Sequence, residues 1–240
     1  MKYLLLAILS LSASSAFALG VESVSITGPD CDSSNTSVVF SPDNATFSIL
    51  YGSMETTSQG GPRDYDMGKA IAPQRRCKIT IAYRPAAGKQ VELQQIDYRG
   101  FVSAPTDKSY GIIESKHRFL GGSIAMGTGR SPSEHLNSGV FIIKQGPYQD
   151  DFSWSARFSP TSHFPNLGMH ISNCTGKADL VIDTNVRGHS FDIEQDVSVV
   201  LDSADARLGG QAAVYKVVEN KCDKINQARD RVCRNRVCPN

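Results

Sequence analysis

Six cysteines are the residues of this chain whose chemistry is easiest to foresee. They are Cys31, Cys77, Cys174, Cys222, Cys233 and Cys238. In an exported protein, which the N-terminus described below indicates, such a set favours a disulfide framework, although six cysteines allow many pairings. Their order suggests Cys31 with Cys77, Cys174 with Cys222, and Cys233 with Cys238. Zinc is the competing interpretation, but the chain has no Cys-x-x-Cys pair to support it.

One acidic stretch imitates a calcium-binding loop. Asp183, Asn185 and Arg187 alternate along the chain, and Glu194 stands at the twelfth position of the series. Helix-loop-helix calcium sites use this spacing, but they need an oxygen ligand where Arg187 places a cation. The residues around it alternate in the manner of a strand. We therefore interpret this stretch as a strand followed by a turn, with no metal.

Carboxylates elsewhere raise the question of a glycosidase. Glu114 could act with Asp150 or Asp151, but a sequence does not give the carboxyl separation that such a pair needs. Trp154 could stack on a sugar ring, but it alternates with other apolar residues between 152 and 158, which places it in the core. These residues do not amount to an active site.

The five histidines show no ligand spacing such as His-Glu-x-x-His. They are His117, His135, His163, His170 and His189. His163 and His170 share a loop, where a surface metal site competes with ordinary loop polarity, and we favour the latter. Ser123 lies in Gly-Gly-Ser-Ile-Ala, which lacks the closing glycine of a nucleophile elbow. We predict no catalytic residue, no metal and no cofactor.

The N-terminus has the parts of a secretory signal peptide. Lys2 is followed by a short apolar run and by the small residues Ala16-Phe17-Ala18. That run is too short for a spanning helix, which needs about 20 apolar residues. We therefore expect cleavage near Ala18 and export to the periplasm or the medium. The expected division is a signal peptide at 1–18, one domain at 19–222 and a tail at 223–240.

Charge gives little information about partners. The formal net charge is +1 for the whole chain, and removal of Lys2 brings it to zero. Residues 221–240 contain six Lys and Arg against two Asp, a net of +4. A balanced body with a basic tail does not favour nucleic acid. The tail could bind an anionic envelope polymer or a membrane surface, although a solvated terminus is the simpler interpretation.

Alternating strands must position all these residues. The clearest is 77–83, where Cys77, Ile79, Ile81 and Tyr83 fall on one face. Similar patterns predict strands near 21–27, 37–40, 46–51, 91–101, 112–120, 140–143, 152–158, 180–186, 197–201 and 213–218. We expect long connections at 52–76 and at the glycine-rich 121–139, and a short helix at 223–232. The sequence thus predicts an all-β, antiparallel β-sandwich of jelly-roll type, stapled by disulfides, with a short C-terminal helical tail.

The order of several motifs resembles a known family. It is carried by Val-Val-Phe-Ser-Pro-Asp at 38–43, Cys-Lys-Ile-Thr-Ile at 77–81, Asp-Tyr-Arg-Gly-Phe at 97–101 and Asp-Thr-Asn-Val-Arg at 183–187, set among the first four cysteines. The chain resembles the secreted family called domain of unknown function 4360 over about residues 24–222. The resemblance implies export, an all-β body and the two long-range cysteine pairs, but no activity. The tail with Cys233 and Cys238 and the 121–139 excursion depart from the family pattern.

The sequence leads to two hypotheses about function. The first is a non-catalytic structural or binding module outside the cytoplasm, with an envelope polymer or glycan as partner. The second is a secreted hydrolase acting on glycans or peptides. An enzyme needs a pocket with at least two convergent acid/base groups, whereas a binding module needs a shallow polar groove or an exposed aromatic patch.

Overall fold

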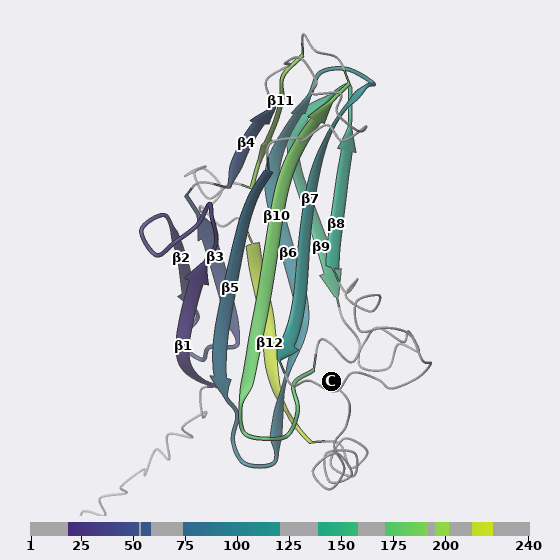
Figure 1. The fold of residues 1–240 in the computed structure, drawn as a ribbon. Helices are drawn as coiled ribbons and strands as arrows, with labels where there is room; N and C mark the ends of the chain where they lie inside the picture. Colours follow the sequence, from purple (N-terminus) through teal and green to yellow (C-terminus); the bar gives the residue numbers. More distant parts are fainter. Residues whose placement is uncertain are drawn as a thin grey trace, which may run out of the picture.

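The computed structural model describes residues 19–52, 54–58, 74–120, 139–157, 171–191, 195–201 and 213–222. Within these ranges every regular element is a β-strand, and the strands form two antiparallel sheets (Figure 1). No helix of the described ranges is long and apolar enough to cross a membrane. The all-β antiparallel fold expected from the sequence is therefore confirmed.

The two sheets take their strands from all along the chain. The first sheet has the order β1 (Gly20–Thr27), β5 (Gln74–Arg84), β10 (Ala178–Ser190), β7 (Ser109–Leu120) and β8 (Gly139–Gln145). The second contains β2 (Thr36–Phe40), β3 (Thr46–Tyr51), β12 (Ala213–Lys221), β6 (Lys89–Ala104), β11 (Val197–Val200) and β4 (Glu55–Ser58), and β9 (Tyr148–Arg157) also pairs with β6. We call them the β10 sheet and the β6 sheet.

The long strand β6 organises the second sheet. Residues 95–98 pair with both β9 and β12, and residues 101–103 pair with both β9 and β11. A strand residue has neighbours on only two sides, so β9 lies along one side of β6 while β12 and β11 follow each other along the other. The two edges of this sheet are therefore β9 on one side and β2 and β4 on the other.

The core lies between the inner faces of the two sheets. On β5, Cys77, Ile79, Ile81 and Tyr83 are buried, whereas Lys78 between them is exposed. This two-residue alternation is what a strand with one solvated face requires. The β6 sheet contributes a matching buried row from β3, β6 and β12. The molecule is thus β-sandwich-like, with a core built from alternate residues of each strand.

Most strands appear where the sequence predicts them. The structure adds β4 in the segment 52–76, which we expected to be a connection throughout. The sequence Glu-Thr-Thr-Ser has no apolar alternation, so β4 could not be predicted from it. β4 forms through its pairing with β11. Asn44, with φ of 55°, lies in the turn between β2 and β3. The expected helix at 223–232 lies outside the described residues, as do residues 121–138 of the expected excursion 121–139. Gly139 is the first residue of β8.

The two long-range disulfides join the pairs suggested by the order of the cysteines. Cys31 is bonded to Cys77, and Cys174 to Cys222. These links span 46 and 48 residues of sequence, so in the chain-entropy model each restricts the unfolded chain by about 4 kcal/mol. The first ties the segment after β1 to β5, and the second ties the segment before β10 to the end of β12. Cys233 and Cys238 lie outside the described residues.

Candidate functional site

A group of polar side chains lies in the middle of the core, and we call it the interior polar cluster. The β6 sheet contributes three tyrosines and the β10 sheet contributes two hydroxyls and an imidazole, all of them buried. The members are Tyr51, Tyr98, Ser115, His117, Thr184 and Tyr215. They face each other because each stands on the inner side of its strand.

Hydrogen bonds connect this cluster across the gap between the sheets. The hydroxyl of Tyr98 donates to Ser115 Oγ at 2.6 Å and also lies 2.9 Å from His117 Nε2 and 2.7 Å from the hydroxyl of Tyr215. Ser115 Oγ in turn lies 3.0 Å from Thr184 Oγ1, which lies 3.1 Å from the hydroxyl of Tyr51. Buried polar groups are costly unless they are paired, and here the pairing runs from one sheet to the other.

Burial keeps the phenols of this cluster protonated. It raises the pKa of Tyr98 to about 12, against a smaller lowering by the hydrogen bonds with Ser115 and Tyr215. Burial also raises the pKa of Tyr51 and of Tyr215, and the neighbouring phenols add to the effect. A closed group of paired donors and acceptors fixes how the two sheets are aligned. With members at most 3% exposed, it offers no entry to a substrate.

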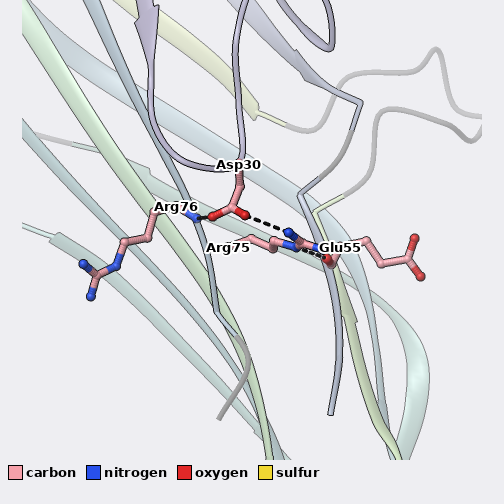
Figure 2. Close-up of polar contacts among 4 residues, drawn as sticks. All are labelled: Asp30, Glu55, Arg75 and Arg76. Carbon is pink, nitrogen blue, oxygen red and sulfur yellow. Dashed lines mark hydrogen bonds and ion pairs between the residues drawn. The ribbon is translucent and has the colours of Figure 1, made fainter. Parts of the chain in front are cut away.

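A second polar group clamps the segment after β1 onto β5 (Figure 2). Asp30 Oδ1 accepts a bond from Arg75 Nη1 at 2.7 Å, and Asp30 Oδ2 accepts one from the backbone N–H of Arg76 at 2.9 Å. Arg75 Nε donates to the carbonyl of Glu55 at 3.2 Å. Burial alone would raise the pKa of Asp30, but its bonds to Arg75 and Arg76 outweigh that effect and lower it. Asp30 and Arg76 directly precede the two cysteines of the Cys31–Cys77 bridge. The group therefore has a structural role, which is to hold the segment after β1 against β5.

Glu92 is the buried carboxylate of the β6 sheet. It is 3% exposed, it pairs with Ile171 through an isolated antiparallel β-bridge, and its Oε2 accepts a bond from Asn220 Nδ2 at 2.6 Å. Burial raises the pKa of the Glu92 carboxyl, and the bond from Asn220 opposes this. A carboxyl with a raised pKa has the property of a general acid, but catalysis also requires a partner group and access.

The carboxylates considered for a glycosidase do not converge. Glu114 lies on the outer face of the β10 sheet and forms an ion pair with Lys116 at 3.0 Å. Asp150 and Asp151 lie on β9, which belongs to the β6 sheet. Glu114 therefore points away from the sheet that carries the two aspartates, an arrangement that does not give the ~5–9.5 Å separation of glycosidase carboxyls. Trp154 is half-buried and packs against the core, as its alternation indicated.

Some of the residues considered as metal ligands lie within the described part of the chain, where they belong to strands. Asp183 and Arg187 lie on strand β10, so the first part of the calcium-like spacing falls on a strand. Glu194 lies outside the described residues. Among the residues that the structure describes, no group of three or more His, Cys, Asp or Glu could hold a metal ion. His117 belongs to the interior polar cluster, and His135, His163 and His170 lie outside the described residues, as does Ser123.

Three aromatic side chains gather on the outer face of the β10 sheet, and we call them the surface aromatic cluster. They are Tyr110 on β7, His189 on β10 and Phe191 just after β10. The rings of Tyr110 and His189 stack at 4.8 Å with 7° between their planes. The Phe191 ring lies 4.5 Å from His189 and 6.2 Å from Tyr110. Phe191 is 54% exposed, so the group presents ring surface to solvent.

Register places these rings together. Tyr110 and His189 are direct Cα partners across β7 and β10, and Gln145 of β8 is the partner of Tyr110 on the other side. The backbone N–H of Phe191 donates to the carbonyl of Lys108 at 3.0 Å, which holds it against the turn between β6 and β7. Directly opposite residues on one sheet face are natural neighbours.

Polar residues adjoin the surface aromatic cluster through the backbone and through strand register. Asp107 and Lys108 are exposed in the adjacent turn, and Gln145 is exposed at the end of β8. Gln145 Nε2 donates to the carbonyl of Asp107 at 3.0 Å, which ties β8 to the turn. The site therefore combines an apolar ring surface with a carboxylate, an ammonium group and an amide at its margin. This composition is typical of shallow binding sites rather than of acid/base catalysis.

Sequence reasoning did not find this cluster. His189 was considered only as a metal ligand, and neither Tyr110 nor Phe191 was singled out. The alternation of the strand could have placed Tyr110 on the surface. Tyr110 lies two residues before Ile112, so it shares the face of the strand on which the even-numbered residues point outward. The partner strand had to be known before His189 could be placed beside it, and no local pattern supplies that pairing.

Comparison with known proteins gives one strong match. Residues 18–222 match the family described as "Domain of unknown function (DUF4360)". No curated protein matches the chain. Among solved structures, one of TmCBM61 in complex with β-1,4-galactotriose aligns with 82% of this chain and 88% of its own, at 10% identity and a TM-score of 0.30. A likeness of that size carries no argument about this chain.

Proposed function

The chain belongs to the family of domain of unknown function 4360, and from that premise we propose that it is an exported, non-catalytic module that binds a glycan or an envelope polymer. The surface aromatic cluster is the observation that carries this proposal. Within the part of the chain that the structure describes, this cluster combines exposed aromatic surface with both hydrogen-bond donors and acceptors.

A sugar ring suits such a surface. Its C–H faces are apolar and carry slight positive charge, while aromatic faces are slightly negative. Its hydroxyls need both donors and acceptors, which Lys108, Gln145 and Asp107 supply at the margin. The Phe191 ring is more exposed than the rings of Tyr110 and His189. The stacked pair of Tyr110 and His189 packs against it.

The disulfide framework supports a compartment outside the cytoplasm. We propose a signal peptide at 1–18, a mature domain at 19–222 and a basic tail at 223–240, with the mature protein in the periplasm or the medium. Two long-range disulfides support this, because they persist in oxidising compartments and are rare in the cytosol. The finer topology that we propose is of jelly-roll type, since successive strands from β4 to β7 and from β8 to β11 alternate between the two sheets.

The proposal is tested by a binding screen of the mature protein, residues 19–240, against a glycan array and isolated envelope polymers. Residues 19–222 form a second sample that separates the tail from the domain. Phe191→Ala and Tyr110→Ala should each lower the affinity for any polymer bound by the domain by about tenfold. Leu120→Ala is the matched control, because Leu120 is an exposed apolar residue on the same strand and face.

Three results would contradict the proposal. One is that neither sample binds any polymer. Another is binding by 19–240 that is lost in 19–222, which would assign binding to the basic tail. The third is equal affinity in Phe191→Ala, Tyr110→Ala and Leu120→Ala, which would place the site elsewhere on the domain.

A secreted hydrolase is the second candidate, and Glu92 is the observation in its favour. A buried carboxyl with a raised pKa could donate a proton to a leaving group. The test is the release of reducing sugar or peptide fragments from the same polymers, with Glu92→Gln as the variant. Release by the wild type that disappears in Glu92→Gln would establish the hydrolase and overturn the non-catalytic proposal.

A further inference from the structure

Strand β8 is an edge of the β10 sheet, and two of its apolar side chains, Phe141 and Ile143, face solvent. Its inner neighbour is β7, and no described strand pairs with its other side (Figure 1). Phe141 and Ile143 are each 52% exposed on the outer face, whereas Ile142 between them is buried. The strand reads Gly-Val-Phe-Ile-Ile-Lys-Gln, with four successive apolar residues.

The other edges of the described sheets carry features that oppose pairing. β1 contains an irregularity between Val21 and Ser23 and an ion pair between Glu22 and Arg84. β2 and β4 have only five and four residues. β9 carries the exposed carboxylates of Asp150 and Asp151. Natural proteins use bulges, charge and short length to block edge-to-edge association, and β8 has none of these over its apolar residues.

The sequence of β8 is complementary to itself. In an antiparallel pair of two β8 strands centred on Ile142, Phe141 of each copy stands opposite Ile143 of the other. Registers centred on Phe141 or on Ile143 would instead set Ile143 opposite Gly139 or Phe141 opposite Gln145. The Ile142 register also places the single charge, Lys144, opposite Val140 rather than opposite itself. Aromatic and β-branched residues directly opposite each other are favourable cross-strand pairs.

We propose that two copies of this chain associate through β8, in antiparallel register centred on Ile142, to form one continuous ten-stranded sheet. The interface is isologous, as two-fold dimers require. One strand of seven residues per copy is a small interface, so the dimer forms and dissociates with protein concentration. The exposed carboxylates of Asp150 and Asp151 on β9 confine the continuation to the β10 sheet.

The two-fold axis stands perpendicular to the sheet, so both outer faces point the same way. The two surface aromatic clusters then lie on one continuous surface, one in each protomer. A polymer long enough to reach both would gain avidity from the second contact. The dimer itself depends only on β8, so it stands or falls independently of what the clusters bind.

Engineered cysteines test the register in the mature protein, whose native cysteines remain in place. Phe141→Cys combined with Ile143→Cys should form a disulfide-linked dimer under mild oxidation, because the two positions face each other across the axis. Either substitution alone should give little crosslinking. Dimer formation by Phe141→Cys alone or by Ile143→Cys alone would overturn the Ile142 register.

Sedimentation tests the association without crosslinking. The wild type should shift from monomer toward dimer as concentration rises, whereas Phe141→Lys should remain monomeric at concentrations at least tenfold higher. Val39→Lys on β2 is the control, because Val39 is 53% exposed and lies far from β8 in the other sheet. Circular dichroism and thermal unfolding establish that both variants fold. A wild type that stays monomeric throughout, or equal dimerisation by Phe141→Lys, would overturn the proposal.

Discussion

The interior polar cluster and the surface aromatic cluster use similar residues in opposite ways. Tyr98 lies beside His117 at 0% exposure, with its hydroxyl within hydrogen-bonding distance of three side chains. Tyr110 lies beside His189 on the outer face of the same sandwich, where their rings stack and Phe191 adds exposed surface. One pair links two sheets through its polar atoms, and the other presents its ring surfaces.

The difference shows that residue type alone does not assign a role. A tyrosine whose polar atom is enclosed contributes to stability, because losing its partners leaves buried groups unpaired. A tyrosine whose ring face is reachable contributes to recognition, because its apolar surface is still available to be covered. Substitutions in the interior polar cluster should therefore lower the free energy of unfolding, and substitutions in the surface aromatic cluster should lower binding affinity.

The largest expected effect is truncation of the central phenol. Tyr98→Ala should lower the free energy of unfolding by about 3–5 kcal/mol, because it leaves a cavity and removes the hydroxyl that joins the sheets. Tyr110→Ala, the matched change on the surface, should cost about 1 kcal/mol, mainly the lost ring stack. Urea unfolding of both variants measures the contrast. Equal losses would remove the distinction between the two regions.

Alkaline pH should weaken the interior cluster next. The folded pKa of Tyr98 is about 12, against 10.0 for an ordinary tyrosine, so the folded state holds this proton more tightly than the unfolded chain does. Stability is then intact below about pH 10 and falls as the pH rises toward 12, by up to about 3 kcal/mol from Tyr98 alone. Tyr51 and Tyr215, whose pKa values are also raised, change in the same direction. Urea unfolding at successive pH values measures this, and constant stability to pH 12 would contradict it.

Removing only the hydroxyl should have a smaller effect. Tyr98→Phe keeps the ring but deprives Ser115, His117 and Tyr215 of a shared partner, which should cost about 1–3 kcal/mol. Tyr110→Phe should leave stability within about 0.5 kcal/mol of the wild type. Thermal unfolding compares the two, and a neutral Tyr98→Phe would mean that the network adds nothing to the packing of its rings.

The smallest effect belongs to the clamp at Asp30. Its pKa is lowered in the folded state, so its contribution is present above the unfolded pKa and is lost as the pH falls through the folded value. Because the Arg75 side chain is half exposed, Asp30→Asn should cost less than about 1 kcal/mol at neutral pH and nothing in acid. Asp107→Asn, in an exposed turn, is the control. A difference that persists unchanged in acid would show that the charge of Asp30 is not its source.

The sequence predicts the strands better than it predicts their neighbours. Alternation places Cys77, Ile79 and Ile81 in the core and sets β3 at its observed bounds, because period two follows directly from one buried face. β4 is missed because its stability comes from pairing with β11. The surface aromatic cluster is missed for the same reason, since Tyr110 and His189 are 79 residues apart in sequence and adjacent only by register. Long-range pairing is the information that local patterns do not contain.

The central claim is that the surface aromatic cluster binds and the interior polar cluster does not. Nuclear magnetic resonance of the aromatic side chains, during titration with the polymer that binds best in the screen, tests it directly. We expect the ring signals of Tyr110, His189 and Phe191 to shift as polymer is added, while those of Tyr51, Tyr98 and Tyr215 stay in place. Saturable binding that leaves the signals of Tyr110, His189 and Phe191 unmoved would contradict it.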